Sequence, residues 1–242
     1  MNQAGLEILP DPQALADRVA AWLLSAAQAK GGRIAVALSG GSTPRRLHET
    51  LASPAFREVF PWARTHWFWG DERFVPQHDP LSNYRMVREA MLARAPIPAA
   101  NIHAIPTEGL TPEAAASAYE RELKAFYGAD RIDPARPLFD VTLLGLGSDG
   151  HIASLFPGDA ALDERRHWVV AVIGATSEAR ITLTYPALEN SAAIAFLVEG
   201  RGKRDVFRRL RRGDPVLPAT QLRPNGELWL FADTAAAGES VA

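Results

Sequence analysis

The chain has 242 residues, of which 26 are basic, 28 are acidic and 47% are hydrophobic, for a formal net charge of −2. This composition is typical of a globular protein with a sizeable core, and it argues against a nucleic-acid-binding or membrane-binding surface. The absence of cysteine from the sequence excludes disulfides, thiolate nucleophiles and cysteine metal sites. Neither a secretory signal nor a run of roughly 18 apolar residues is evident, so we expect a cytoplasmic protein.

Helices and short apolar strands are predicted to alternate along the chain. The first helix opens at Asp11, a capping residue followed by proline, and closes at the glycine pair 31–32. Further helices are predicted around Leu47 and Leu51 and over three later segments: Ser82–Leu92, Pro112–Tyr127 and Gly202–Arg212. Compact apolar runs predict the strands: Ile34–Leu38, Trp67–Trp69, Val141–Leu144, Trp168–Ile173, Arg180–Thr184, Ala193–Val198 and Leu228–Ala232.

This alternation favours an α/β fold with a covered, largely parallel sheet. The sequence shows no linker and no internal repeat, and we expect one domain over residues 1–242. In such sheets, ligands bind beyond the carboxyl ends of the strands. Glycines after strands often make only tight turns. Here, however, three polar loops with chemically suited residues follow predicted strands and are expected to meet at one edge: Ser39–Pro44, Gly70–Arg73 and Gly145–His151.

The first of these segments, SGGSTP, joins a strand to a helix. Gly40 and Gly41 let the backbone approach a ligand, and the first amides of a helix lack partners. Ser42 and Thr43 add hydroxyl donors, so the segment predicts a small anion site suited to a phosphate monoester. It is not a Walker loop, because no lysine follows the glycines, and Thr43 alone could be a simple helix cap.

The second segment, GDER, combines carboxylates with an arginine. On an open surface such a cluster is a weak salt bridge. Facing a cleft, Arg73 could instead bind a phosphate or carboxylate through two parallel hydrogen bonds. Glu72 could then orient Arg73, and Asp71 could face a sugar hydroxyl.

The third segment places Asp149 two residues before His151. An imidazole is the natural base near neutral pH, and Asp149 could orient it or contact the substrate. A lone histidine is more often structural, and it is the location of His151 that distinguishes it. No third ligand with recognisable spacing accompanies the pair, so no metal site is predicted. Because no serine occupies a G-x-S-x-G elbow, we expect general-base chemistry with water rather than covalent catalysis.

Together, SGGSTP, WGDERFVPQHDPLSNYRMV and LLGLGSDGHIASLFPG resemble the glucosamine-6-phosphate isomerase/6-phosphogluconolactonase family, with weaker similarity in ARITLTYPAL and GRGKRDVF. The resemblance implies a three-layer Rossmann-like domain, similar to the superfamily of glucosamine-6-phosphate deaminase and ribose-5-phosphate isomerase. It implies hydrolysis of 6-phospho-D-glucono-1,5-lactone to 6-phospho-D-gluconate, the second step of the oxidative pentose phosphate pathway. It implies no metal or organic cofactor, a small-molecule phosphosugar lactone as the partner, no nucleic acid or membrane, and a monomer.

The same resemblance assigns roles to particular residues. His151 matches the general base that activates water for attack on the lactone carbonyl, and Asp149 matches the acidic residue of that motif. Glu72, Asn83 and Arg85 are expected in the same region, with their roles open. The other matching positions are expected to bind the substrate, several of them at its phosphate: Gly40, Gly41, Ser42, Thr43, Asp71, Arg73, Arg180 and Lys203.

Two other functions remain open at the level of the sequence. The deaminase branch of the family typically reads DGHIAFNEPG, with an acidic residue where this chain has Phe156, and a phenylalanine cannot move protons. That branch also tends to read MDEY where this chain reads WGDER, so both differences favour the lactonase. The second alternative is a phosphosugar-binding sensor without catalysis, against which the retention of Asp149 and His151 argues.

Overall fold

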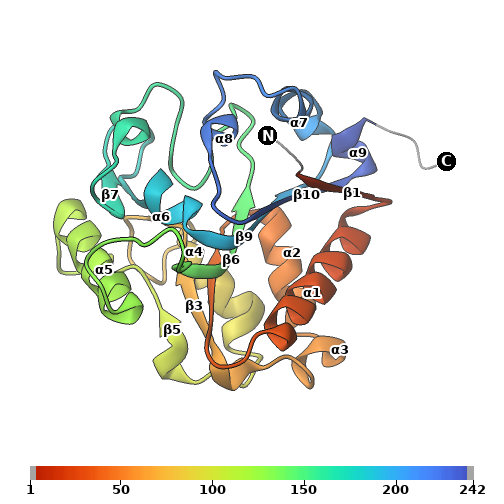
Figure 1. Cartoon of the computed structure of the whole chain (residues 1–242), viewed down its shortest axis with the longest axis horizontal. Helices are drawn as coiled ribbons and strands as arrows, with labels where there is room; N and C mark the ends of the chain where they lie inside the picture. Colours follow the sequence, from red (N-terminus) through yellow and green to blue (C-terminus); the bar gives the residue numbers. More distant parts are fainter. Residues whose placement is uncertain (1–3, 239–242) are drawn as a thin grey trace.

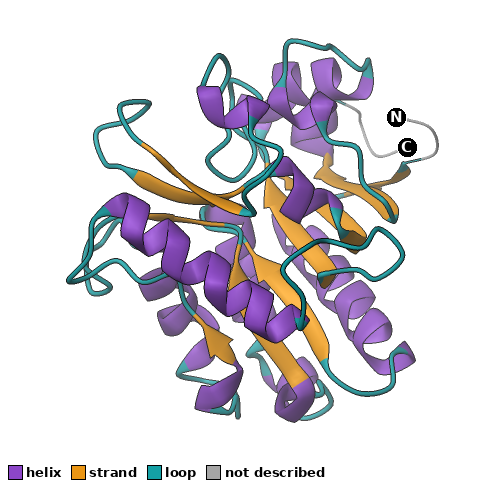
Figure 2. Cartoon of the chain, turned by 60° about the vertical axis from the view of Figure 1, so that its left-hand side comes forward, coloured by secondary structure: helices purple, strands orange, loops and turns teal. Residues whose placement is uncertain are grey.

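The computed structural model describes residues 4–238. Its centre is a seven-stranded sheet in the order β1-β10-β9-β6-β2-β3-β5, in which every neighbouring pair of strands is parallel. Helices cover both faces of this sheet (Figures 1 and 2). The α/β fold with a largely parallel sheet is therefore confirmed.

The seven strands of the main sheet are β1 (Gly5–Leu9), β2 (Ile34–Leu38), β3 (Thr65–Trp69), β5 (Ile102–His103), β6 (Phe139–Gly145), β9 (Ser191–Val198) and β10 (Glu227–Asp233). All five residues of β2 are buried, as expected for a strand covered on both faces. The sequence pattern does not reveal β1 and β5, the two edge strands. Neither contains a buried residue, so neither produces the apolar run that marks a central strand.

A second, antiparallel sheet has the order β4-β8-β7 and consists of β4 (Asp71–Arg73), β8 (Arg180–Leu183) and β7 (Val169–Val172). The prediction of a loop for the GDER segment is therefore wrong for Asp71–Arg73. A strand of three charged residues has no apolar period, and only its pairing with β8 defines it. Gly70 joins the two sheets, since its N–H donates to Leu38 O and its carbonyl accepts from Leu183 N, both at 2.8 Å.

The longer helices are α1 (Pro12–Ala29), α2 (Ser42–Leu51), α5 (Pro112–Tyr127) and α7 (Arg204–Arg211). Asp11 caps α1, because its carboxylate accepts from the backbone N–H groups of Gln13 and Ala14 at 2.8 and 2.9 Å. As predicted, α5 ends at Gly128, which has a φ of +78°. No helix within residues 4–238 is long and apolar enough to cross a membrane.

The shorter helices are α3 (Pro54–Arg57), α4 (Asn83–Val87), α6 (Tyr185–Glu189), α8 (Pro218–Gln221) and α9 (Thr234–Ala237). The helix predicted over Ser82–Leu92 is α4 followed by the π-helical turn η2 (Arg88–Leu92). Single 3-10 turns complete the fold: η1 (Trp62–Arg64), η3 (Ala99–Asn101), η4 (Ala160–Asp163) and η5 (Arg201–Lys203).

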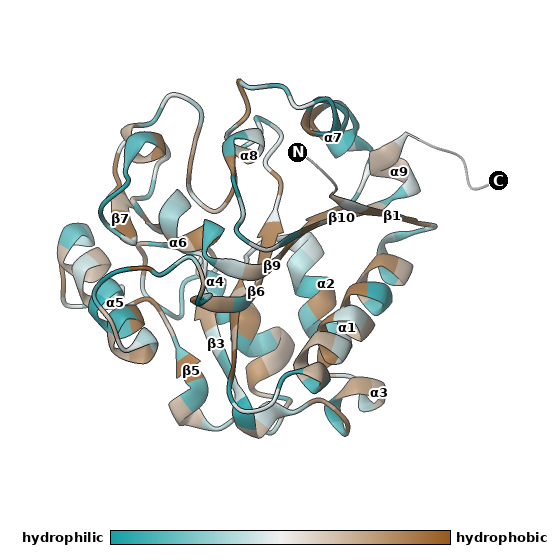
Figure 3. Cartoon of the chain, in the orientation of Figure 1, coloured by the Kyte–Doolittle hydropathy of each residue, from teal (hydrophilic) through white to brown (hydrophobic). Residues whose placement is uncertain are grey.

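The hydrophobic core lies between the main sheet and its covering helices. Trp67, Phe68 and Trp69 of β3 are fully buried in it. Figure 3 shows brown, hydrophobic strands at the centre, and it shows the ribbon of α7 largely in teal, the colour of hydrophilic residues. Because the strands are parallel, the segments that leave β2, β6 and β9 lie at the same edge of the sheet.

Candidate active site

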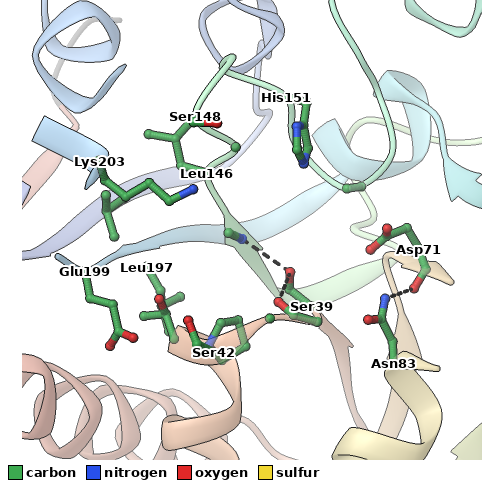
Figure 4. A pocket seen from close by; sticks show the side chains of 18 of the residues that line it. Ser39, Ser42, Asp71, Asn83, Leu146, Ser148, His151, Leu197, Glu199 and Lys203 are labelled. Carbon is green, nitrogen blue, oxygen red and sulfur yellow. Dashed lines mark hydrogen bonds between the residues drawn. The ribbon is translucent and has the colours of Figure 1, made fainter. Parts of the chain in front are cut away.

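A cleft of about 370 Å³ opens at the carboxyl ends of β2, β6 and β9, and β4 and β8 contribute to its wall. Figure 4 shows the side chains of several elements pointing into it. Asp149 does not line this cleft and instead contacts His151. The other residues expected from the sequence to act in catalysis or to bind the substrate line it: Gly40, Gly41, Ser42, Thr43, Asp71, Arg73, His151, Arg180 and Lys203.

The loop between β2 and α2 brings backbone amides to the cleft. Gly41 has a φ of +98°, a conformation that glycine adopts without strain. A Cβ on Gly40 would lie 1.9 Å from Oδ1 of Asn83, so this close contact requires glycine. No side chain of the described residues caps α2, which leaves the N–H groups of Ser42 and Thr43 available to an anion.

His151 and Asp149 form a hydrogen-bonded pair in the turn after β6. Nδ1 of His151 lies 2.6 Å from Oδ1 of Asp149, which also accepts from the backbone N–H of His151 at 3.1 Å. Partial burial raises the pKa of the Asp149 carboxyl, but the hydrogen bonds and charge of His151 outweigh it and hold this pKa below its ordinary value. An ionised carboxylate only accepts, so a neutral His151 carries its proton on Nδ1 and offers Nε2 as a base.

Two glycines make this turn possible. The N–H of Gly147 donates to the carbonyl of His151 at 2.9 Å. A Cβ on Gly147 would lie 2.2 Å from Nδ1 of His151 and 2.5 Å from Oδ1 of Asp149. Gly150 has a φ of +87° and packs against Leu217. The glycines of this segment therefore allow the turn and also leave the space that the side chains of His151 and Asp149 need to contact each other.

Arg73 and Arg180 are paired across the antiparallel strands β4 and β8, and both line the cleft. Burial, and next the charge of Arg73, lower the pKa of Arg180. Arg73 donates from Nη1 to the carbonyl of Leu81 at 2.6 Å, while its buried Nε has no hydrogen-bond partner among the described residues. Like charges in this position repel, and an anion between them would relieve the repulsion.

Lys203, the last residue of η5, provides a third cation. Figure 4 shows its ammonium group directed into the cleft, on the side where Ser42 and Glu199 lie. Burial lowers the pKa of Lys203, and the negative charge of Asp149 acts in the opposite direction. The cleft thus combines three cations with the free amides of α2.

Glu72 and Arg85, expected in the same region, do not line the cleft. The side chain of Arg85 donates to the carbonyl of His78 at 2.8 Å and pairs with Glu89. Glu72 is only 2% exposed. Desolvation raises its pKa to about 7, although three backbone N–H groups act in the opposite direction.

The cleft also contains residues that the sequence pattern does not single out. Thr176, in the β7–β8 hairpin, accepts a hydrogen bond from Nε of Arg180 at 3.1 Å. Glu199 follows β9 and lies 3.7 Å from Nε of Arg46. The sequence feature that could have identified Glu199 is its position directly after an apolar strand, the same feature that identifies the three polar loops. Within the described part of the chain, no three His, Asp or Glu side chains are grouped so that they could hold a metal ion.

Comparisons with known proteins relate this architecture to a family. Residues 10–230 match the family model described as glucosamine-6-phosphate isomerases/6-phosphogluconolactonase. The chain is 39% identical to a 6-phosphogluconolactonase of Nostoc sp. over 241 residues, 97% of each chain. The structure of 6-phosphogluconolactonase from Thermotoga maritima has a TM-score of 0.81 at 30% identity and covers 96% of this chain and 100% of that one. A monomeric glucosamine-6-phosphate deaminase, at 19% identity and a TM-score of 0.81, covers 97% and 99% and shares the fold.

Proposed function

Because the chain belongs to the glucosamine-6-phosphate isomerase/6-phosphogluconolactonase family, we propose that it hydrolyses 6-phospho-D-glucono-1,5-lactone with His151 as general base. It is a lactone-hydrolysing enzyme of the pentose phosphate pathway, and its relatives from Nostoc and Thermotoga are 6-phosphogluconolactonases. The observation that carries the mechanism is the pairing of His151 with Asp149, at 2.6 Å, beside a cleft with three cations.

In the proposed reaction, Nε2 of His151 accepts a proton from water as the water oxygen attacks the lactone carbonyl. Asp149 holds the other ring proton on Nδ1 and stabilises the imidazolium that forms. The bond between the carbonyl carbon and the ring oxygen then breaks, and His151 returns the proton to that oxygen. The product carboxylic acid ionises to 6-phospho-D-gluconate.

The phosphate is proposed to bind among the cations of the cleft. Arg73 and Arg180 converge there, and Lys203 and the N–H groups of Ser42 and Thr43 supply further donors. Charge-assisted hydrogen bonds to a phosphate are strong and directional. Binding at this remote group orients the lactone carbonyl toward His151.

The surroundings of His151 favour hydrolysis over the deaminase reaction. The ring of Phe156 lies against the imidazole, with 4.7 Å between the ring centroids. The deaminase branch has an acidic residue at this position of the motif. An aromatic ring cannot relay a proton, so this chain lacks that step of the isomerisation.

The test is to form the lactone in place and follow its hydrolysis with and without the protein, with the spontaneous rate subtracted. We expect rapid hydrolysis that falls by about 10²- to 10⁴-fold in His151→Ala, the usual contribution of a general base. His78→Ala, at an exposed histidine outside the cleft, is the control and should keep its activity. Activity that survives His151→Ala would refute the mechanism but not the reaction. A wild-type rate equal to background would favour the sensor, which a phosphosugar binding titration would then test.

A further inference from the structure

Glu72 stands between two residues of the cleft wall, Asp71 and Arg73, but its own side chain is buried behind them. This follows from strand alternation, since successive residues of β4 point to opposite faces. Glu72 does not contact the cleft, and the reaction does not use it. We propose that Glu72 is a positioning residue whose carboxylate fixes the wall formed by Asp71, Arg73 and Asn83. This inference rests on the proposed function, because that wall is taken to hold the lactone.

Four donors converge on the carboxylate of Glu72. Oε1 accepts from the backbone N–H groups of Arg73 and Asn83, both at 2.7 Å. Oε2 accepts from the N–H of Tyr84 at 2.7 Å and from the hydroxyl of Ser82 at 3.1 Å. The carboxylate thereby ties the first turn of α4 to β4. Above the raised pKa of Glu72, about 7, the ionised carboxylate accepts all four hydrogen bonds, whereas an amide or a carboxylic acid must donate at one of these positions.

Asn83 connects the buried carboxylate of Glu72 to the cleft. Its backbone is held by Glu72, and its side-chain Nδ2 donates to the carbonyl of Asp71 at 3.0 Å (Figure 4). That bond leaves Oδ1 against Gly40, where a Cβ would lie only 1.9 Å away. The loop between β2 and α2 therefore packs directly on the amide that Glu72 positions. A displacement of Asn83 would move this anion-binding loop as well as β4.

Glu72→Gln tests the role, with Glu120→Gln as a matched control. Glu120 is also buried and accepts from the N–H groups of Trp168 and Val169 at 2.9 and 3.2 Å, away from the cleft. We expect both variants to lose thermal stability. Only Glu72→Gln should lower kcat/KM, by about 10- to 100-fold, with a lower kcat and a higher KM, because the wall is misplaced. An unchanged kcat/KM in Glu72→Gln would overturn the proposal and leave a purely structural role.

A double-mutant cycle with Asn83→Ala tests whether Glu72 acts through Asn83. If it does, adding Glu72→Gln to Asn83→Ala should lower kcat/KM only a little further. A double variant whose loss in kcat/KM equals the product of the two single losses would contradict the proposal. Should Glu72→Gln fail to fold, Ser82→Ala removes one of the four donors, together with the hydrogen bond by which Ser82 caps α4 at the N–H of Arg85, and is expected to change kcat/KM in the same direction.

A measurement that needs no substrate separates this inference from the proposed function. We expect Glu72→Gln to shift the backbone amide NMR signals of Asn83 and Gly40, because Glu72 holds the backbone of Asn83 and the side chain of Asn83 packs against Gly40. An unmoved Gly40 signal would count against the positioning role. Absence of lactone hydrolysis by the wild-type chain would count against the function alone.

Discussion

Arg73 and Arg180 face each other across two antiparallel strands at the cleft, although both carry a positive charge. Adjacent like charges destabilise a pair of strands. The pKa of Arg180 is lowered by burial and then by the charge of Arg73, in keeping with this strain. A dianion bound between the two guanidinium groups would convert the repulsion into two favourable contacts, so stability and anion binding should be linked at this pair.

Arg180→Met should therefore weaken substrate binding. We expect KM for the lactone to rise about 10- to 100-fold, equivalent to the roughly 1.5–3 kcal/mol of a hydrogen bond to a charged group. Inorganic phosphate should raise the Tm of the wild-type chain but have little effect on the variant. Arg208→Met, at an arginine that pairs with Asp205 outside the cleft, is the control for loss of a surface charge. An unchanged KM in Arg180→Met would exclude Arg180 from the phosphate site.

Asp149→Asn should disable the base while preserving its shape. An asparagine amide can donate to Nδ1 of His151, which would place the ring proton on Nε2, where water must be deprotonated. We expect kcat to fall by at least about 10²-fold, close to the loss in His151→Ala, with KM little changed. Steady-state kinetics on both variants checks this. If Asp149→Asn loses far less than His151→Ala, Asp149 does not set the tautomer.

Gly147→Ala should abolish activity through geometry alone. The added Cβ would lie 2.2 Å from Nδ1 of His151 and 2.5 Å from Oδ1 of Asp149, so both side chains must move. Gly31→Ala is the matched control, because a Cβ there meets no atom of the described residues within 4 Å. Hydrolysis assays and thermal unfolding of both variants are the measurements. An active Gly147→Ala enzyme would contradict the proposed mechanism, because it would show that His151 and Asp149 can be displaced without loss of activity.

His48 and Glu72 should give opposite dependences of stability on pH. His48 is fully buried on α2, and burial lowers its pKa from 6.5 to about 4. As pH falls from 6.5 to 4, His48 binds a proton in the unfolded chain but stays neutral in the folded chain. The free energy of unfolding therefore falls by about 3 kcal/mol. The pKa of Glu72 is raised from 4.5 to about 7. The folded chain then keeps a proton that the unfolded chain has released, and about 3 kcal/mol is lost as pH rises from 4.5 to 7.

The two effects largely cancel in the wild-type chain, and single variants should separate them. His48→Gln retains an N–H for the carbonyl of Ser39, which lies 3.4 Å from Nε2 of His48. This variant should become more stable on acidification from pH 7 to 4.5, whereas Glu72→Gln should become less stable. Urea unfolding at the two pH values gives the free energies. If the free energy of unfolding changes with pH in the same way in the wild type, His48→Gln and Glu72→Gln, the pKa shifts assigned to His48 and Glu72 are wrong.

Much of the protein is determined by local sequence. A buried parallel strand needs a continuous apolar run, and a helix needs a cap and a period of 3.6 residues, so β2, β6, β9, α1 and α5 can all be read from the chain. The glycines, carboxylates and cations of the three polar loops also identify the edge of the sheet where ligands bind, because parallel strands end together.

Only the tertiary structure decides which of these side chains meet. Arg73 and Arg180 become neighbours because β4 pairs with β8, and a strand of three charged residues leaves no local trace of that pairing. Glu72 turns away from the cleft for the same reason, since alternation along β4 is defined only once the strand exists. Residue types and their order therefore specify the chemistry, whereas long-range hydrogen bonding between strands decides which groups face the substrate and which support them from behind.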